Sequence, residues 1–191
     1  MVFIKVLLPK NTGFKKIVEN LRTTIISDKI DLLLFRGEDI PALVEEFSAK
    51  NLLVLGITGE DLYSEYLLKV NNKSNLKIIR KGIWDDSAFI FRKPTLSLLL
   101  PKNKKLADFS VLKFAVNKKY RQLAMQFLQK KYSAMPEMLL FNGETEQAVK
   151  QGLAEACIDV VCTGKTAFDL GLYVSETIFF SDFVLIGRGV E

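Results

Sequence analysis

Short apolar runs alternate along the chain with segments of helical periodicity. Runs rich in leucine and β-branched residues predict buried strands at residues 2–8, 31–35, 52–57, 113–116, 137–141 and 157–162. Between them, apolar residues recur at helical spacing, which predicts helices over residues 58–70, 117–131 and 144–156. Strand–helix alternation is typical of parallel sheets flanked by helices. We therefore predict an α/β fold.

The helix over residues 117–131 has the clearest pattern. Its apolar stripe follows the i, i+3, i+4, i+7, i+8 spacing of one helix face, at Tyr120, Leu123, Ala124, Phe127 and Leu128. Asn117 stands at the N-cap position, where a side-chain oxygen can accept from a free backbone N–H.

The pattern changes between residues 82 and 105. Two successive strands are predicted there, at residues 88–91 and 95–100, separated by Arg92-Lys93-Pro94. We interpret this segment as a crossover between two α/β lobes. The first lobe is expected to comprise residues 1–94 with 177–191, and the second residues 95–176.

Composition adds little to this picture. The 191 residues are enough to bury a proper core, and the formal charge of +5 invites a nucleic-acid partner. However, the lysines are scattered among acids with no long basic block, so we expect no nucleic-acid partner. A mild positive excess also suits small anionic substrates, which it attracts over long range.

Several classes of site are excluded by what the sequence lacks. With no histidine and two cysteines, a zinc site and histidine acid–base catalysis are not expected. The apolar stretch at residues 96–100 is far shorter than the ~20 residues of a membrane span, and residues 1–10 do not resemble a secretory signal. We expect a cytoplasmic protein with no membrane partner.

The segment DVVCTGKT, residues 159–166, raises the question of a nucleotide site. Its Gly-Lys-Thr ending matches the end of a P-loop, but the position of the first P-loop glycine is occupied by Asp159. A P-loop is therefore excluded. What remains is an apolar run carrying one acid, followed by Thr-Gly-Lys-Thr and a helical segment.

Two interpretations of this segment stay open. Backbone N–H groups at a helix start bind phosphate well, Thr163, Lys165 and Thr166 add side-chain donors, and Gly164 allows close approach. Asp159 would then hold ribose hydroxyls or Mg²⁺ beside the phosphate. In the simpler interpretation, the segment is an ordinary turn with a capping threonine.

A second pair of loops has similar chemistry. Arg36 and Asp39 follow a predicted strand, with Pro41 in the first turn of the next helix. The run 55–65, LGITGEDLYSE, follows with a Gly-Ile-Thr-Gly turn and an acidic helix start. Arg36 could equally form a surface ion pair with a neighbouring acid, a contact worth ~0–1 kcal/mol.

These motifs, in this order, resemble the ATP phosphoribosyltransferase family. The resemblance rests on Arg36-x-x-Asp39-Ile40-Pro41, on Leu55-Gly56-Ile57-Thr58-Gly59-x-Asp61 with Glu65 beyond, and on residues 142–172. That last run contains Asn-Gly-x-x-Glu, Gly-Leu-Ala and Asp-x-Val-x-Thr-Gly-x-Thr in the family's order. The Leu-Pro-Lys at residues 8–10 also matches the start of a family segment.

The resemblance implies a fold, a reaction and partners. The fold is two α/β lobes around a cleft, similar to type II periplasmic binding proteins. The reaction transfers phosphoribosyl from phosphoribosyl pyrophosphate to N1 of ATP, with Mg²⁺, as the first step of histidine biosynthesis. The chain's size resembles the short form of the family, which implies a homodimer or a hetero-oligomer with a separate regulatory subunit.

The resemblance also implies site residues. Residues expected to bind phosphoribosyl pyrophosphate are Asp159, Thr163, Gly164, Lys165, Thr166 and Glu146; others expected in the substrate cleft are Lys10, Arg36, Asp39, Thr58 and Gly59. No metal ligand from the protein is assigned, and no catalytic residue is. Glu146 could instead be an ordinary first-turn helix acid, and a lysine after a strand, such as Lys10, is commonplace.

Two departures from the family pattern fall in the first lobe. Residues 10–14 read Lys-Asn-Thr-Gly-Phe where the family has Lys-Gly-Arg-Leu, and Val54 stands where the family has an acid. Both changes concern ATP handling more than sugar-phosphate binding. They leave open an alternative, in which the chain is a non-catalytic cytoplasmic ligand-binding or regulatory paralogue on the same scaffold.

Overall fold

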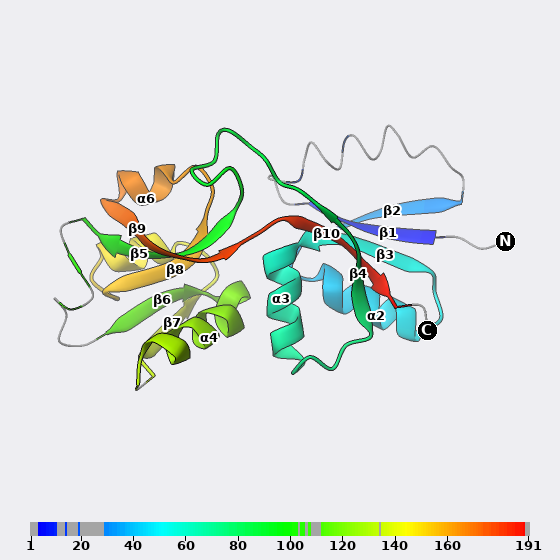
Figure 1. Ribbon diagram of the computed structural model, residues 1–191, viewed down its shortest axis with the longest axis horizontal. Coiled ribbons are helices and arrows are strands. Elements are labelled where there is room, and N and C mark those ends of the chain that lie inside the picture. The colour runs from blue at the N-terminus through cyan, green and yellow to red at the C-terminus, as the bar shows by residue number, and fades with distance from the viewer. Residues whose placement is uncertain are drawn as a thin grey trace. The chain divides into compact units, whose positions relative to one another are not determined.

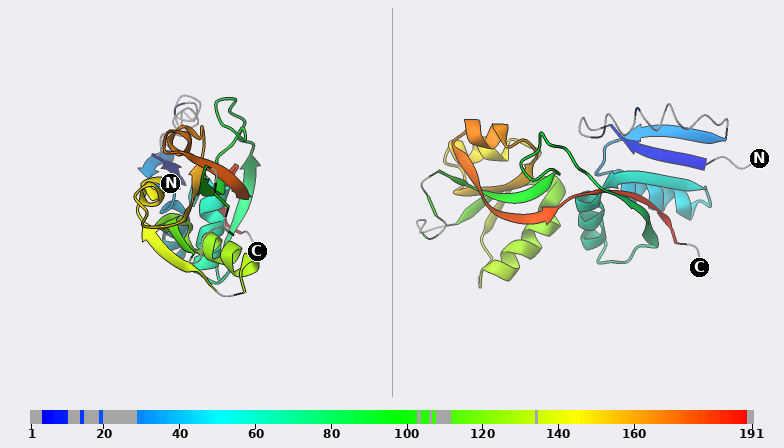
Figure 2. Two further views of the ribbon diagram at one scale, coloured as in Figure 1. Left: turned by 90° about the vertical axis from the view of Figure 1, so that its left-hand side faces the viewer. Right: turned by 45° about the horizontal axis from the view of Figure 1, so that its top comes forward.

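The computed structural model describes residues 4–10, 14, 19, 29–102, 104–105, 107, 112–133 and 135–189. The chain forms two compact units. The first consists of Met1–Ile83 and Asp182–Glu191, and the second of Trp84–Ser181. The second unit is therefore inserted into the first, and the chain passes between them twice (Figures 1 and 2).

The first unit is built on a sheet with strand order β2-β1-β3-β10-β4 among the described residues. Its elements are β1 (Ile4–Pro9), β2 (Ile30–Phe35), α2 (Ile40–Ala49), β3 (Val54–Gly59), α3 (Glu60–Lys69), β4 (Leu76–Gly82) and β10 (Phe183–Arg188). Strands β1, β2 and β3 are parallel. The returning strand β10 is antiparallel to both of its neighbours, β3 and β4.

The core of the first unit lies between this sheet and helices α2 and α3 (Figure 1). Gly56 lets α2 approach β3 closely, because a Cβ there would lie 2.5 Å from Ile40 Cγ2 and 2.6 Å from Val44 Cγ2. Pro41 lies in the first turn of α2, as predicted. The carboxylate of Glu45 in α2 accepts from the hydroxyls of Tyr66 and Ser74, at 2.7 and 2.6 Å, which ties α3 and its following loop to α2.

The second unit repeats this topology with strand order β7-β6-β8-β5-β9. Its elements are β5 (Thr95–Pro101), β6 (Lys113–Asn117), η3 (Lys118–Tyr120), α4 (Arg121–Lys131), β7 (Glu137–Phe141), α5 (Thr145–Lys150), β8 (Ala156–Val161), α6 (Lys165–Asp169) and β9 (Leu172–Phe180). Strands β6, β7 and β8 are parallel, while β5 is antiparallel to β8. In both units, three parallel strands in the order second-first-third are followed by one antiparallel strand.

Alternation along β6 directs its side chains to two faces. On one face, Ala115 packs in the cluster that contains residues of α5 and α6. On the other, Phe114 packs against Tyr132, just after α4, with 5.9 Å between the two ring centroids. The predicted stripe of α4 is confirmed, since Tyr120, Leu123, Ala124 and Leu128 are buried; Phe127 is half-buried. No helix in the described part of the chain has the length and apolarity to cross a membrane.

Three predictions of secondary structure were wrong. Residues 88–91 form turns, not a strand, because their backbone makes local hydrogen bonds, from Phe89 N to Asp86 O and from Arg92 N to Phe89 O, each at 3.0 Å. The helix predicted over 144–156 ends at Lys150, followed by Gly152 with a φ of +73°. The sheets are mixed, not wholly parallel, because β10 and β5 enter from the opposite direction.

The structure divides the chain at Ile83 and Ser181, whereas the sequence analysis placed residues 84–94 and 177–181 with the first lobe. Strand pairing explains the difference at the second point. Strand β9 pairs with β5 up to Phe180, and Ser181 N donates to Pro94 O. At the first point, the backbone N–H of Ile90 donates to Cys162 O in the second unit.

Candidate functional site

The carboxyl ends of three adjacent parallel strands meet at one edge of the second unit's sheet. Strand β6 ends at Asn117, β7 at Phe141 and β8 at Val161, and β6 lies between the other two. Ligands of open α/β sheets bind beyond the carboxyl ends of the strands. The residues that follow these ends are therefore the place to look for a site.

The carboxylate of Asp159 is fixed by donors from several parts of the unit. The Asn117 Nδ2 group lies 3.0 and 3.1 Å from its two oxygens. The hydroxyl of Thr145, at the start of α5, lies 2.9 Å away, and the backbone N–H of Val160 donates at 2.8 Å. Asn117 and Thr145 are both buried. The orientation of the carboxylate is therefore set by the pairing of β6 with β8, which places Asn117, and by the start of α5, which places Thr145.

Glu146 lies beside this network in the first turn of α5. Its Oε2 atom is 3.3 Å from the Thr145 hydroxyl, which is closer to Asp159 and has only one proton to donate. Burial raises the pKa of Glu146 above its ordinary value, and the negative charge of Asp159 raises it further. Glu146 and Asp159 thus form an acidic pair in which Asp159 takes most of the hydrogen bonds.

Cys157 lies beneath this pair on β8. It is fully buried, and burial raises the pKa of its thiol, with further contributions from the charges of Glu146 and Asp159. A thiol in such surroundings stays protonated and is a poor nucleophile. Cys157 is therefore a core residue.

The segment from Thr163 to Thr166 follows β8 and opens α6, as predicted. Gly164 has a φ of +69°, in the left-handed region that favours glycine. The side chains of Thr163, Lys165 and Thr166 are exposed. Lys165 Nζ lies 2.6 Å from Asp169 Oδ2, but an exposed ion pair of this kind contributes little. Its ammonium group therefore remains available to an anion.

The residues predicted for the first unit also gather at one edge of a sheet. Lys10 follows β1, Arg36 follows β2, and Thr58 and Gly59 end β3, in neighbouring parallel strands. The side chains of Lys10, Arg36 and Asp39 are exposed.

Thr58 is placed differently from its neighbours at this edge. It is fully buried, and its hydroxyl donates to Gly37 O at 2.7 Å. It therefore holds the loop after β2 in place, and it does not present its hydroxyl to solvent.

The two departures in the first unit have different outcomes. Val54 is 4% exposed and packs in the core of the unit. An unpaired acid in that position would carry a large desolvation cost, so the valine is consistent with its surroundings. Residues 11–13 of the other departure lie outside the described residues.

Two residues of the site were missed by the sequence analysis. Asn117 was predicted as an N-cap, which is confirmed, since its Oδ1 accepts from Lys119 N at 3.4 Å. Its second contact, with Asp159, spans 42 positions of sequence and leaves no local signal. Thr145 was overlooked because it lies inside the Asn-Gly-x-x-Glu motif at a position that the motif leaves free.

Among the described residues, no group of three or more Cys, Asp or Glu side chains is arranged to hold a metal ion. Mg²⁺ is usually bound by one or two carboxylates together with substrate phosphates and water. The oxygens of Asp159 already accept four hydrogen bonds. Glu146 is the carboxylate at this edge with more capacity for a cation or a hydroxyl.

Comparisons with known proteins agree with this architecture. Residues 36–190 match the profile of the family described as ATP phosphoribosyltransferase. A chain of the ATP phosphoribosyl transferase (HisG:HisZ) complex from Thermotoga maritima superimposes with a TM-score of 0.75 at 17% identity, over 97% of this chain and 88% of that one.

Binding proteins of the periplasm share the fold. The aliphatic sulphonate binding protein SsuA from Escherichia coli gives a TM-score of 0.60 at 16% identity, over 96% of this chain and 65% of that one. The alkanesulfonate-binding protein SsuA from Xanthomonas axonopodis gives a TM-score of 0.56 at 13% identity, over 98% of this chain and 66% of that one. The predicted fold class, two α/β units similar to type II periplasmic binding proteins, is confirmed.

Proposed function

Because the chain belongs to the ATP phosphoribosyltransferase family, we propose that it transfers the phosphoribosyl group of phosphoribosyl pyrophosphate to N1 of ATP. This is the first step of histidine biosynthesis, and we place it in the cytoplasm. The observation that carries the proposal is the edge of the second unit, where Asp159 and Glu146 lie beside the exposed Thr163–Thr166 segment.

We assign the two halves of this edge to the two ends of the sugar phosphate. Backbone N–H groups and the hydroxyls of Thr163 and Thr166 suit the 5-phosphate, with Lys165 supplying positive charge. The acidic pair suits the ribose, whose hydroxyl groups are hydrogen-bond donors to carboxylates. Glu146, which has fewer hydrogen bonds than Asp159, would accept from a ribose hydroxyl.

The reaction needs placement and electrostatics more than proton transfer. The lone pair of N1 of ATP forms a bond to the anomeric carbon of the ribose. The bond from that carbon to the pyrophosphate oxygen breaks, and pyrophosphate leaves with the electron pair of the broken bond. Positive charge develops on the ribose ring as this happens. A fixed anion such as Asp159 stabilises such charge without reorganising, because its orientation is already set by Asn117 and Thr145.

Mg²⁺ belongs to the proposal as a partner of the leaving pyrophosphate, whose negative charge it would neutralise. Glu146 is the residue at this edge that would approach it. ATP is assigned to the first unit, where Lys10 and Arg36 offer exposed positive charge at the ends of β1 and β2. The buried Thr58 supports that edge indirectly, through its bond to Gly37 O.

We further propose a hetero-oligomer with a separate regulatory subunit. The support is the similarity in fold, over 97% of this chain, to a chain from the HisG:HisZ complex. A homodimer of the catalytic chain is compatible with such an assembly.

The test is a direct assay. The protein is incubated with both substrates, Mg²⁺ and pyrophosphatase, alone and with candidate regulatory subunits, and phosphoribosyl-ATP is followed. Asp159→Asn is the matched variant, and we expect it to lose turnover while remaining folded. Absence of product in every combination, with the wild-type protein folded, contradicts the proposal.

A thermal-shift screen separates the enzyme from a non-catalytic binding protein. A ligand at 100 times its Kd stabilises by roughly 2.7 kcal/mol. We expect stabilisation by phosphoribosyl pyrophosphate and by ATP. Stabilisation by an unrelated solute, and by neither substrate, would favour a binding or regulatory role.

A further inference from the structure

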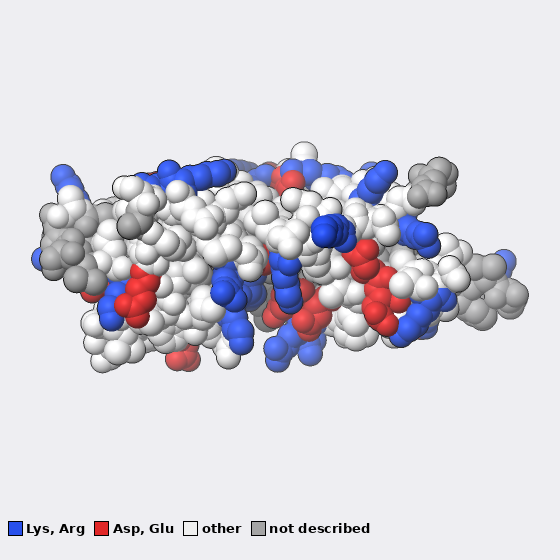
Figure 3. Space-filling view, turned by 90° about the horizontal axis from the view of Figure 1, so that it is seen from below, with Lys and Arg blue, Asp and Glu red and all other residues white. Residues whose placement is uncertain are grey.

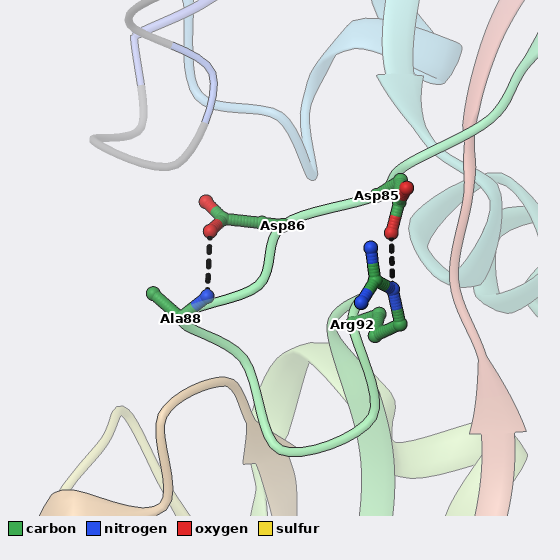
Figure 4. A network of polar contacts seen from close by, with 4 residues as sticks. All are labelled: Asp85, Asp86, Ala88 and Arg92. Carbon is green, nitrogen blue, oxygen red and sulfur yellow. Dashed lines mark hydrogen bonds and ion pairs between the residues drawn. The ribbon is translucent and has the colours of Figure 1, made fainter.

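A compact loop at residues 85–92 is held in shape by its own polar contacts (Figure 4). The backbone N–H of Asp86 donates to Arg92 O at 2.7 Å, which closes the loop. The Asp86 carboxylate accepts from Ala88 N at 2.9 Å, and Arg92 Nε lies 2.5 Å from Asp85 Oδ1. Arg92 has a φ of +62°, a conformation that costs an L-residue energy and that these contacts maintain.

Aromatic contacts flank Ile90 in this loop, one within the segment itself and one to strand β9. Trp84, which is buried, stacks with Phe89 at 6.1 Å between ring centroids. Phe91 meets the ring of Phe180, at the end of β9, edge to face at 6.0 Å. Ile90 lies between these two anchored residues, so its position is fixed from both sides.

Ile90 contacts the segment assigned to the phosphate. Its backbone N–H donates to Cys162 O at 3.0 Å, directly before Thr163. Its side chain covers Gly164 so closely that a Cβ on that glycine would lie 2.1 Å from Ile90 Cδ1. Ile90 is nevertheless 54% exposed, so it is a poor candidate for a core residue.

The hydrogen bond to Cys162 O has a geometric consequence. In a trans peptide the C=O and the next N–H point in opposite directions, and the described chain contains no cis peptide. Since the Cys162 carbonyl points at Ile90, the N–H of Thr163 points away from the loop. Within the described residues, the N–H groups of Thr163 and Gly164 have no hydrogen-bond acceptor. Successive free N–H groups of this kind form an anion-binding concavity.

We propose that the loop at residues 85–92 supports the phosphate-binding segment, and that Ile90 is a positioning residue for phosphoribosyl pyrophosphate. Ile90 orients the peptide between Cys162 and Thr163 and packs against Gly164, which keeps the free N–H groups directed at the ligand. This inference rests on the proposed function, and it adds a residue outside the family motifs that support that function.

The first test compares Ile90→Ala with two matched variants. Ile90→Leu keeps a side chain of similar size, and Ile79→Ala truncates an isoleucine of the same exposure, 54%, in strand β4 of the first unit. We expect Ile90→Ala to raise KM for phosphoribosyl pyrophosphate about tenfold, below the ~100-fold that a 1 Å misplacement can cost. We expect kcat and the KM for ATP to be unchanged, Ile90→Leu to recover most of the loss, and Ile79→Ala to show none.

Calorimetry with phosphoribosyl pyrophosphate, with ribose 5-phosphate and with ATP gives a readout independent of turnover. Ile90→Ala should weaken ribose 5-phosphate binding and leave ATP binding alone. If the wild type binds and Ile90→Ala binds ribose 5-phosphate equally well, the role of Ile90 is wrong and the proposed function stands. If the wild type binds neither phosphoribosyl pyrophosphate nor ribose 5-phosphate, both are overturned.

A double-mutant cycle tests the packing itself. Gly164→Ala introduces a Cβ that meets Ile90, so its effect on ribose 5-phosphate affinity should differ between the wild type and the Ile90→Ala background. Residues in contact show such coupling, whereas independent residues give additive effects. Additive losses would show that Ile90 does not act through Gly164, and they would overturn this inference.

Discussion

The side-chain amide of Asn117 donates to both carboxylate oxygens of Asp159, at 3.0 and 3.1 Å, although the two residues are 42 positions apart. The contact exists because β6 and β8 are neighbours in the sheet. The same Asn117 side chain accepts from Lys119 N at the start of η3. One residue therefore joins the acidic pair to the start of the next helix.

The hydroxyl of Thr145 offers the cleanest test of this network. Thr145→Val keeps the shape of the side chain but removes the donor to Asp159, whereas Thr145→Ser keeps the donor. A hydrogen bond to a charged group is worth roughly 1.5–3 kcal/mol, so we expect kcat/KM to fall by about tenfold to a hundredfold in the valine variant. The serine variant should stay near wild type. Equal losses in the two variants would mean that Thr145 matters only for packing.

The exposed threonines of the phosphate segment should have a separable role. Thr163→Val and Thr166→Val remove exposed hydroxyls, and that of Thr163 accepts only a long hydrogen bond from Lys165 N, at 3.4 Å, so the melting temperature should change little. Each variant should weaken the binding of phosphoribosyl pyrophosphate by about tenfold to a hundredfold, because it loses a hydrogen bond to a charged group. Calorimetry with each substrate measures this. A loss of ATP binding of the same size would contradict the assignment of this segment to the sugar phosphate.

Glu146 should make stability depend on pH. Burial, and then the charge of Asp159, raises its pKa above the ordinary 4.5. The folded state thus binds this proton more tightly than the unfolded chain, so the stabilisation is present in acid and is lost as pH rises through the raised pKa. Glu146→Gln should therefore melt above wild type near pH 7, with a difference that shrinks toward pH 4.5.

The control for Glu146 is its exposed neighbour Glu144. Glu144→Gln should leave the melting temperature nearly unchanged at every pH. A Glu146→Gln variant that is less stable than wild type near pH 7 would show that the carboxylate is stabilised by its surroundings. Thermal unfolding monitored by circular dichroism across the pH range gives both comparisons.

Glu45 should show the opposite dependence. Burial raises its pKa, but hydrogen bonds from Ser74, Tyr66 and the backbone of Asn75 outweigh burial and hold the pKa below 4.5. The contribution to stability is present above pH 4.5 and is lost as pH falls through the lowered pKa. Glu45→Gln should cost about 1 kcal/mol near neutrality and less in acid. Glu46→Gln, which breaks only an exposed pair with Lys50, should have a smaller effect in urea unfolding.

The close approach of α2 to β3 predicts a cost for the smallest enlargement of Gly56. Ile40 and Val44, which a Cβ would meet, are fully buried and have no room to move. We expect Gly56→Ala to lower the free energy of unfolding by about 1–3 kcal/mol, as overpacking does. Adding Val44→Ala should recover part of that loss. If the losses of the Gly56→Ala and Val44→Ala variants are fully additive, the new Cβ does not press on Val44 and the overpacking argument is wrong.

Sequence patterns identified many of the buried elements, but they missed strands β9 and β10, although Val184 and Ile186 of β10 are fully buried. The stripe of α4 and the runs of β5 and β7 match their predicted ranges closely. Strand β4 had no prediction, because only Leu76 of its seven residues is buried and the strand has no apolar face. Residues 88–91 were predicted as a strand because they are apolar. In the structure they form a turn, and their apolar side chains pack locally, Phe89 on Trp84 and Ile90 on Gly164.

The site was predictable only in part for the same kind of reason. Motif order indicated Asp159 and Glu146, which the structure places beside Thr145 at one edge. Asn117 joins them through strand order, which a single sequence does not contain. The charges on the face shown in Figure 3 are interspersed, with Lys and Arg lying among Asp and Glu. That distribution agrees with the scattered lysines of the sequence.

Strand β10 lies inside the first unit's sheet, between β3 and β4, although it comes from the last part of the chain. A ribosome releasing this protein therefore completes the continuous second unit before the first unit can close. Until residues 183–188 emerge, β3 and β4 each expose an unpaired strand edge, and such edges pair readily with other chains. The first unit thus folds late, because one of its interior strands follows the whole second unit in the chain.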